Sequence, residues 1–86
     1  MYSLAIKSNV DKTFEKLRSK NPKQLNMISK KIEQILKDPH RFKLLRGDLK
    51  GARRVHIDKS FVLVFVIDES KKEIILLDYD HHDNIY

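Results

Sequence analysis

The chain has 86 residues, with 18 Lys and Arg against 12 Asp and Glu, and its formal net charge is +6. A chain of this length is expected to form one small domain, residues 1–86, because it has too little apolar surface for a second core. It contains no cysteine, which excludes disulfides, thiolate metal sites and a cysteine nucleophile, and which is typical of the reducing cytoplasm.

The longest apolar run, over 61–67, has seven residues, whereas a membrane helix needs roughly 20. The first residues also lack the charged and then apolar layout of a signal peptide. We therefore expect a cytoplasmic protein without a membrane span. The excess of positive charge favours a polyanionic partner such as RNA, DNA, anionic lipid or an acidic protein, and does not choose among them.

The first 20 residues predict a strand and a helix. Residues 2–6 alternate weakly between apolar and polar, as in a short strand. Ser8 is a suitable N-cap for a helix over about 9–18, with Asp11 three residues later. Apolar residues then recur at helical spacing, namely Val10, Phe14 and Leu17.

A second helix is predicted over 21–37. Asn21 is a good N-cap, Pro22 suits the first helical position, and Gln24 completes a capping box. The helix ends before Pro39, because the residue that precedes a proline is pushed out of the α region. One face of this helix is an apolar stripe and the other is basic: Leu25, Ile28, Ile32, Ile35 and Leu36 form the stripe, and Lys30 and Lys31 lie outside it.

The second half of the chain predicts three strands. Residues 40–51 contain both glycines and several basic side chains, and we interpret them as a basic, ordered loop. Apolar and polar residues then alternate over 53–58, residues 61–67 are apolar on both faces, and 73–79 form a last strand. The element order is therefore β-α-α-β-β-β, an α+β domain in which two N-terminal helices pack on one face of an antiparallel sheet.

The strand over 53–58 carries polar side chains that point away from the core. Alternation buries Val55 and Ile57 and places three polar residues in a row on the other side, roughly 6.6 Å apart: Arg54, His56 and Asp58. A cation, an imidazole and a carboxylate are thus expected on one water-facing surface. Any strand with a solvent-exposed face has polar residues on it. This row therefore indicates a functional site only if other reactive side chains lie beside it.

The C-terminal sequence DHHDNIY supplies such residues, because the last strand is expected to return His81, His82 and Tyr86 toward the same surface. A metal site is disfavoured, since adjacent histidines diverge on a strand and no thiolate is present. A trailing tail is disfavoured by Ile85 and Tyr86, which favour a packed end. Acid–base chemistry without a cofactor is favoured, because the ordinary pKa of histidine lies near neutrality and RNA carries its own nucleophile, the 2′-OH.

The chain resembles the RelE/ParE superfamily of toxin–antitoxin toxins. The resemblance covers nearly the whole chain and is carried by the order of elements, by the sequence LLRGDLKGARRVHIDKSFVLVFVID over 44–68 and by the ending HxDxIY. It is similar to the RelE-type mRNA interferases, and in histidine placement to the YafQ-type branch. The resemblance implies a RelE-like fold and a monomeric toxin that enters the ribosomal A site, contacts rRNA, cleaves mRNA and is silenced by a RelB-like antitoxin.

The resemblance also implies roles for single residues in a metal-independent attack of the 2′-OH on the adjacent phosphate. His82 matches the C-terminal histidine that acts as general acid, and the general base is either His56 or Asp58. Tyr86 matches an aromatic residue that stacks on or orients the nucleotide. Arg54 is implied to act at the catalytic centre, and the other residues implied to bind phosphate or RNA are Arg53, Lys50, Arg46, His81, Lys30 and Lys31.

The chain departs from the superfamily pattern at the start of the central strand. Many relatives have an arginine on the transition-state phosphate where this chain has Val62, and the acidic residue of the YafQ-type branch falls at Ser60. Two other functions therefore stay open. One is a ParE-like gyrase inhibitor, against which the pair of His56 and His82 argues, and the other is a catalytically weakened toxin that mainly binds its antitoxin.

Overall fold

Strand β1 (Ser3–Ile6) opens the chain, and two long helices follow, α1 (Ser8–Lys20) and α2 (Pro22–Lys37). After one 3-10 turn, η1 (Pro39–Arg41), come strands β2 (Arg53–Ile57), β3 (Phe61–Asp68) and β4 (Glu73–His81), and then a short helix, α3 (His82–Ile85). The structure is a computed structural model that describes residues 1–45 and 51–85. The predicted α+β domain with the order β-α-α-β-β-β is confirmed, and η1 and α3 are additions to it.

The four strands form one sheet in the order β1-β4-β3-β2. Strands β2, β3 and β4 pair antiparallel, as predicted. Strand β1 instead pairs with β4 in parallel, from Ser3 opposite Glu73 to Ile6 opposite Leu76. The prediction of a wholly antiparallel sheet is wrong, because side-chain alternation indicates which face of a strand is buried and not the direction of its neighbour.

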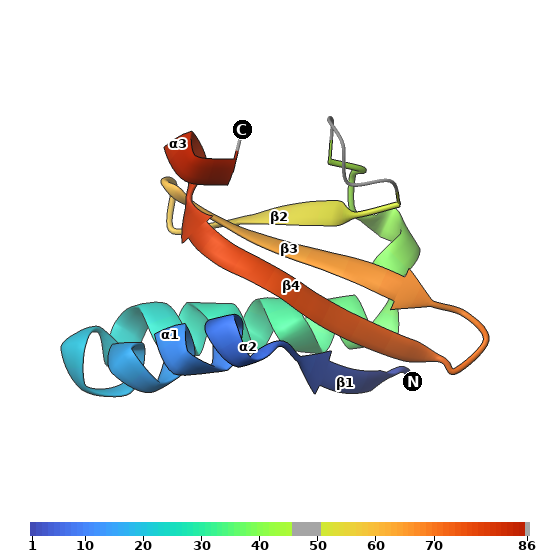
Figure 1. Ribbon diagram of the computed structural model, residues 1–86, viewed down its shortest axis with the longest axis horizontal. Coiled ribbons are helices and arrows are strands. Elements are labelled where there is room, and N and C mark those ends of the chain that lie inside the picture. The colour runs from blue at the N-terminus through green and yellow to red at the C-terminus, as the bar shows by residue number, and fades with distance from the viewer. Residues whose placement is uncertain (46–50, 86) are drawn as a thin grey trace.

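Helices α1 and α2 cover one face of the sheet, which we call the helix face (below the sheet in Figure 1). Their apolar stripes meet inward-facing side chains of the strands, because residues at helical spacing share one helix face and alternate residues share one sheet face. The buried members of this core are Val10, Ile28, Ile35, Val55, Ile57, Leu63, Phe65, Ile74, Leu76 and Tyr79.

The other face of the sheet, which we call the outer face, carries a smaller apolar cluster. Its buried members are Leu45, Ala52, Val62 and Val64, with Val66, Leu77 and Ile85 packed against them. The chain before β2 is held there by backbone pairing, since the Leu45 N–H donates to the Ala52 carbonyl at 2.8 Å. Strand β3 is therefore buried on both sides, as its apolar sequence predicts.

The two long helices begin differently. The Asn21 side chain accepts a hydrogen bond from the Gln24 N–H at 3.1 Å, so the predicted cap of α2 is confirmed. Ser8 is the first residue of α1 and not its cap, which is Lys7 without a side-chain hydrogen bond. The second interaction of the predicted capping box, from the Gln24 side chain back to Asn21, is wrong. The Gln24 side chain is buried and accepts a hydrogen bond from Tyr79 instead.

Gln24 and Tyr79 form a buried polar pair between α2 and the sheet. The Tyr79 hydroxyl donates to Gln24 Oε1 at 2.6 Å, and the two residues are 4% and 5% exposed. The variant Tyr79→Phe leaves the amide oxygen buried without this donor, so we expect the free energy of unfolding to fall by about 1–3 kcal/mol. Urea unfolding of the two proteins measures the difference.

The double variant Gln24→Leu with Tyr79→Phe is the control for this pair. It replaces both polar groups by apolar ones, so it is expected to recover much of the stability that Tyr79→Phe loses. A single variant as stable as the original chain would show that the hydrogen bond contributes nothing to the fold.

Candidate active site

Strand β2 presents Arg54 and His56 on the outer face of the sheet. Its other side holds Val55 and Ile57 in the core, and side chains alternate along a strand. The His56 side chain is exposed and Arg54 is half-buried. Alternation therefore located these two members of the predicted row correctly.

Asp58 does not continue that row. Strand β2 ends at Ile57, and Asp58 and Lys59 have φ values of 45° and 64°, the left-handed backbone that a tight hairpin turn requires. Burial, and then the negative charge of Asp58, raise the pKa of the Tyr79 phenol. The prediction that Asp58 lines up with His56 is wrong, since alternation ends where the turn begins.

The C-terminal histidines reach the same end of the sheet as His56. Strand β4 ends at His81, and the His82 N–H donates to the Ser60 carbonyl at 2.8 Å, in the turn between β2 and β3. Figure 1 shows α3 on the side of the sheet away from α1 and α2, where Ile85 packs on the outer-face cluster. The prediction that the chain end packs down is thus confirmed for Ile85.

A column of aromatic rings supports the histidine pair from the core. Phe61 stacks on Tyr79 with ring centroids 5.5 Å apart, and Phe14 meets Tyr79 edge-on at 5.9 Å. Phe61 also meets the His81 ring edge-on at 5.7 Å. The His81 and His82 rings then stack at 4.6 Å with an interplanar angle of 27°. Such contacts restrict ring orientation, so the imidazoles are held more firmly than isolated surface side chains.

The Asp83 carboxylate faces both imidazoles. Its Oδ1 lies 3.1 Å from His82 Nδ1, and its Oδ2 lies 3.5 Å from His81 Nδ1. The Asp83 N–H also donates to His81 Nδ1 at 3.2 Å. The short helix α3 therefore folds back on the end of β4 and gathers two imidazoles and one carboxylate in one place.

Asp80 is a residue of this site that sequence reasoning missed. It lies opposite Val62 in the β3–β4 ladder, on the outer face, and Val62 in turn lies opposite His56. Asp80 Oδ1 accepts from the His81 N–H at 2.7 Å and from Asn84 Nδ2 at 3.1 Å. The signal for it was available, because Asp78, Tyr79 and Asp80 alternate between charged and aromatic side chains at the end of the last strand.

Val62, where the family resemblance implies an arginine, is closed to solvent in this chain. Val62 is fully buried among Leu45, Ala52 and Val64. The Val62 side chain packs within the outer-face cluster. Apolar packing therefore takes the place of the charge that an arginine would supply at this position.

Arg53 lies on the helix face and holds the chain after η1. Its guanidinium donates to the Phe42 carbonyl at 2.6 Å and to the His40 carbonyl at 3.3 Å. Since alternation separates it from Arg54, the structure does not bring it to the histidines. Odd-numbered residues of β2 face the helices, so Arg53 does not share the outer face with Arg54 and His56. Its role in binding phosphate or RNA stays a prediction.

The remaining predicted cations are not gathered at the histidines either. Lys30 and Lys31 lie on α2, which covers the helix face, on the opposite side of the sheet from His56. His81 lies opposite Phe61 in the β3–β4 ladder, and its ring contacts Phe61, which packs against the helix-face core. His81 therefore does not share the outer face with His56, contrary to the prediction from the sequence. Three further predicted site residues, Arg46, Lys50 and Tyr86, lie outside the described residues.

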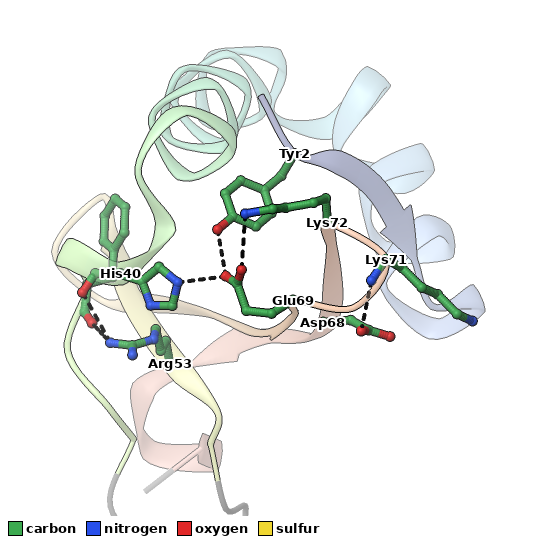
Figure 2. A network of polar contacts seen from close by, with 8 residues as sticks. Tyr2, His40, Arg53, Asp68, Glu69, Lys71 and Lys72 are labelled. Atoms are coloured by element: carbon green, nitrogen blue, oxygen red, sulfur yellow. Dashed lines mark hydrogen bonds and ion pairs between the residues drawn. The ribbon is translucent and has the colours of Figure 1, made fainter.

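A second polar cluster surrounds Glu69 at the other end of the sheet, in the turn between β3 and β4 (Figure 2). The Tyr2 hydroxyl donates to Glu69 Oε1 at 2.5 Å, and His40 Nε2 lies 2.7 Å from the same oxygen. Lys72 Nζ donates to Oε2 at 3.2 Å. Hydrogen bonds from Tyr2, His40 and Lys72 lower the pKa of Glu69 to about 2. The cluster ties the N-terminus and η1 to this turn.

The Glu69 cluster predicts acid sensitivity. Because the folded-state pKa is about 2 and the ordinary value is 4.5, the contribution of Glu69 to stability is present above the ordinary value and is lost as the pH falls toward 2. We expect Glu69→Gln to lower the melting temperature at about pH 6 and to have little effect at about pH 2. Thermal melts at both pH values measure this.

Glu15→Gln is the matched control for that comparison. Glu15 is exposed and forms one surface ion pair, with Arg18 at 3.5 Å, and such pairs contribute little. A Glu69→Gln effect of the same size at both pH values would contradict the assigned role of the cluster.

Toxins of toxin–antitoxin systems share this fold. The chain superposes on the RelBE toxin–antitoxin complex of Escherichia coli with a TM-score of 0.77 at 21% identity, covering 94% of this chain and 96% of that one. It superposes on the YoeB–YefM complex of Staphylococcus aureus with a TM-score of 0.80 at 15% identity, covering 95% and 98%. A copper-bound mutant toxin from Helicobacter pylori matches over 100% of both chains, with a TM-score of 0.80 at 26% identity.

The chain belongs to the ParE-like toxins of type II bacterial toxin–antitoxin systems, whose family model matches residues 4–86. The "Putative toxin RelE4" of Methanocaldococcus jannaschii is 51% identical over 86 residues, which cover 100% of this chain and 92% of that protein. An uncharacterised protein of Methanosarcina mazei is 55% identical over 100% of both. The predicted membership of the RelE/ParE superfamily is confirmed. No helix among the described residues is long and apolar enough to cross a membrane.

Proposed function

We propose that this toxin is a ribosome-dependent endoribonuclease that cleaves mRNA in the A site without a metal ion. The observation that carries the proposal is the hydrogen bond from the His82 N–H to the Ser60 carbonyl, which brings His82 to the end of the sheet where β2 presents His56. Two imidazoles from separate elements, His56 from β2 and His82 from α3, at one end of a sheet are suited to acid–base scission of RNA.

In the proposed reaction, His56 accepts the proton of the ribose 2′-OH while the 2′-oxygen attacks the adjacent phosphorus. The bond from phosphorus to the 5′-oxygen breaks, and protonated His82 gives its proton to that oxygen. The products are a 2′,3′-cyclic phosphate and a 5′-OH. His56 is preferred to Asp58 as the base because His56 lies on β2 beside Arg54, whereas Asp58 lies in the turn after the strand.

Arg54 is the cation assigned to the phosphorane in this proposal. It lies two residues from His56 on the same side of β2, and a fixed positive charge is most effective where negative charge develops in the transition state. Since Val62 is buried and carries no charge, Arg54 and the histidines are the groups left to stabilise the phosphate in the described part of the site.

The proposed partners are mRNA, rRNA and a RelB-like antitoxin, with the toxin itself a cytoplasmic monomer outside its complexes. The charge of +6 favours RNA, and Lys30 and Lys31 on the helix layer are assigned to rRNA while the outer face receives mRNA. The RelBE and YoeB–YefM structures are toxin–antitoxin complexes, which supports a protein antitoxin for this chain.

Cleavage of a defined mRNA on programmed ribosomes by purified protein in EDTA tests the proposal. The expected result is cuts inside the A-site codon that leave 2′,3′-cyclic phosphate ends. If protein with a folded circular dichroism spectrum makes no cuts, the proposal fails.

The description of the matching family as ParE-like toxins keeps the gyrase inhibitor as a second candidate. A supercoiling assay with purified DNA gyrase separates the two, because inhibition of gyrase without mRNA cleavage would select the second. Binding of the antitoxin with neither activity would select the catalytically weakened toxin, for which the absence of a charge at Val62 is the supporting observation.

A further inference from the structure

We infer that His81, His82 and Asp83 form a binding site for one divalent transition metal ion of the Zn²⁺ class. Each residue can offer one ligand atom, and these three atoms all lie within 4.8 Å of one another. The objection from the sequence was that adjacent histidines diverge on a strand. The chain leaves the strand conformation between them, because β4 ends at His81 and α3 begins at His82. The two rings therefore lie close together, with centroids 4.6 Å apart.

The ligand atoms of the three side chains are separated by nearly the distances that one bound ion requires. Zn²⁺ binds imidazole nitrogen and carboxylate oxygen at about 2.0–2.2 Å, so two ligands on one ion lie roughly 3–4 Å apart. Asp83 oxygens already lie 3.1 Å from His82 Nδ1 and 3.5 Å from His81 Nδ1. The side chains are 39–73% exposed, so small rotations complete the site without disturbing the core.

The ligand types also suit a metal. Imidazole coordinates through a ring nitrogen that carries no proton, and each histidine offers two ring nitrogens, Nδ1 and Nε2. Two imidazoles and one carboxylate select Zn²⁺, Cu²⁺ or Ni²⁺ over Mg²⁺ and Ca²⁺, which prefer sites made only of oxygen. Three protein ligands leave a coordination position open to water or to a phosphate oxygen.

A bound metal would act as an inhibitor, and this consequence rests on the proposed nuclease. The ion takes a lone pair of His82, which then cannot carry the proton to the 5′-oxygen. A His82 imidazole that binds the metal therefore cannot serve as the general acid at the same time. EDTA, which removes the metal, is expected to keep the enzyme active.

Calorimetric titration of the metal-free protein with Zn²⁺ tests the site, with Mg²⁺ as the hard-cation control. We expect a 1:1 complex of micromolar affinity with Zn²⁺ and none with Mg²⁺. His81→Ala and Asp83→Asn are each expected to weaken Zn²⁺ binding at least about tenfold. His40→Ala is the matched control, because His40 also faces one carboxylate, Glu69 at 2.7 Å, and it should bind as the original chain does.

Nuclear magnetic resonance of the histidine rings tests the site without any variant. Zn²⁺ is expected to shift the ring signals of His81 and His82 and to leave those of His40 and His56 in place. Absence of saturable binding, or unchanged affinity in both His81→Ala and Asp83→Asn, would overturn the proposal.

Cleavage assays with and without Zn²⁺ then separate the two proposals. Zn²⁺ binding by a protein that never cleaves mRNA would refute the nuclease and leave the metal site standing. Full cleavage at a Zn²⁺ concentration that saturates the calorimetric site would refute the inhibitory role. Cleavage that Zn²⁺ abolishes in the original chain, and abolishes only at about tenfold higher concentration in Asp83→Asn, is the supporting result.

Discussion

Replacing His82 with alanine is expected to lower the rate of mRNA cleavage by about 10²–10⁴-fold, the usual contribution of a general acid. The loss arises because no other described group is assigned to give a proton to the departing 5′-oxygen. Single-turnover cleavage on programmed ribosomes, with saturating protein, measures the chemical step apart from binding.

The fold should survive this change, which makes the experiment interpretable. The bond from residue 82 to the Ser60 carbonyl uses the backbone N–H, which alanine retains, and the His82 side chain is 45% exposed. His40→Ala, at the other end of the sheet, is the control and should cleave normally. A His82→Ala variant within a few-fold of the original rate would remove His82 from the mechanism.

The second large effect is expected at Val62, where Val62→Arg would introduce the arginine that many relatives carry. Val62 is fully buried in the outer-face cluster, and burying an unpaired guanidinium costs on the order of 3–5 kcal/mol. Since small domains are stable by only about 5–15 kcal/mol, we expect a largely unfolded or strongly destabilised protein with no gain in cleavage. Urea unfolding and the cleavage assay are the two measurements.

Val66→Arg is the matched control for Val62→Arg. Val66 lies on the same strand at the edge of the same cluster and is only half-buried, so its arginine can reach water and the cost should be much smaller. A Val62→Arg variant that is stable and cleaves faster would instead show that the cluster opens and that the site accepts the arginine of its relatives.

Side-chain periodicity predicted those features of the fold that are determined within a single helix or strand. The apolar stripe and Asn21 cap of α2, and the doubly buried strand β3, followed directly from local patterns. The parallel pairing of β1 and the short helix α3 did not, because each depends on contacts with residues distant in the chain. Ser8 failed as a cap because several nearby residues suit that role and only the tertiary path selects one.

The candidate site was predictable to the same extent. Alternation placed Arg54 and His56 correctly. Extended two residues back from the buried Val55, it would have placed Arg53 on the helix face. Asp58 was misplaced because strand ends are the least certain part of a pattern. The stacking of His81 on His82 required knowledge of where β4 ends, which no local pattern shows.

The parallel pairing of β1 with β4 affects the order in which the molecule can be assembled. The first strand of the chain has no partner until the last strand exists, since Ser3 pairs with Glu73 and Ile6 with Leu76. Contacts between residues this far apart form late, because the entropy of closing the intervening chain must be overcome first. During synthesis the N-terminal strand and helices are therefore made well before their partner strand, and β1 lacks its pairing with β4 until residues 73–76 are available.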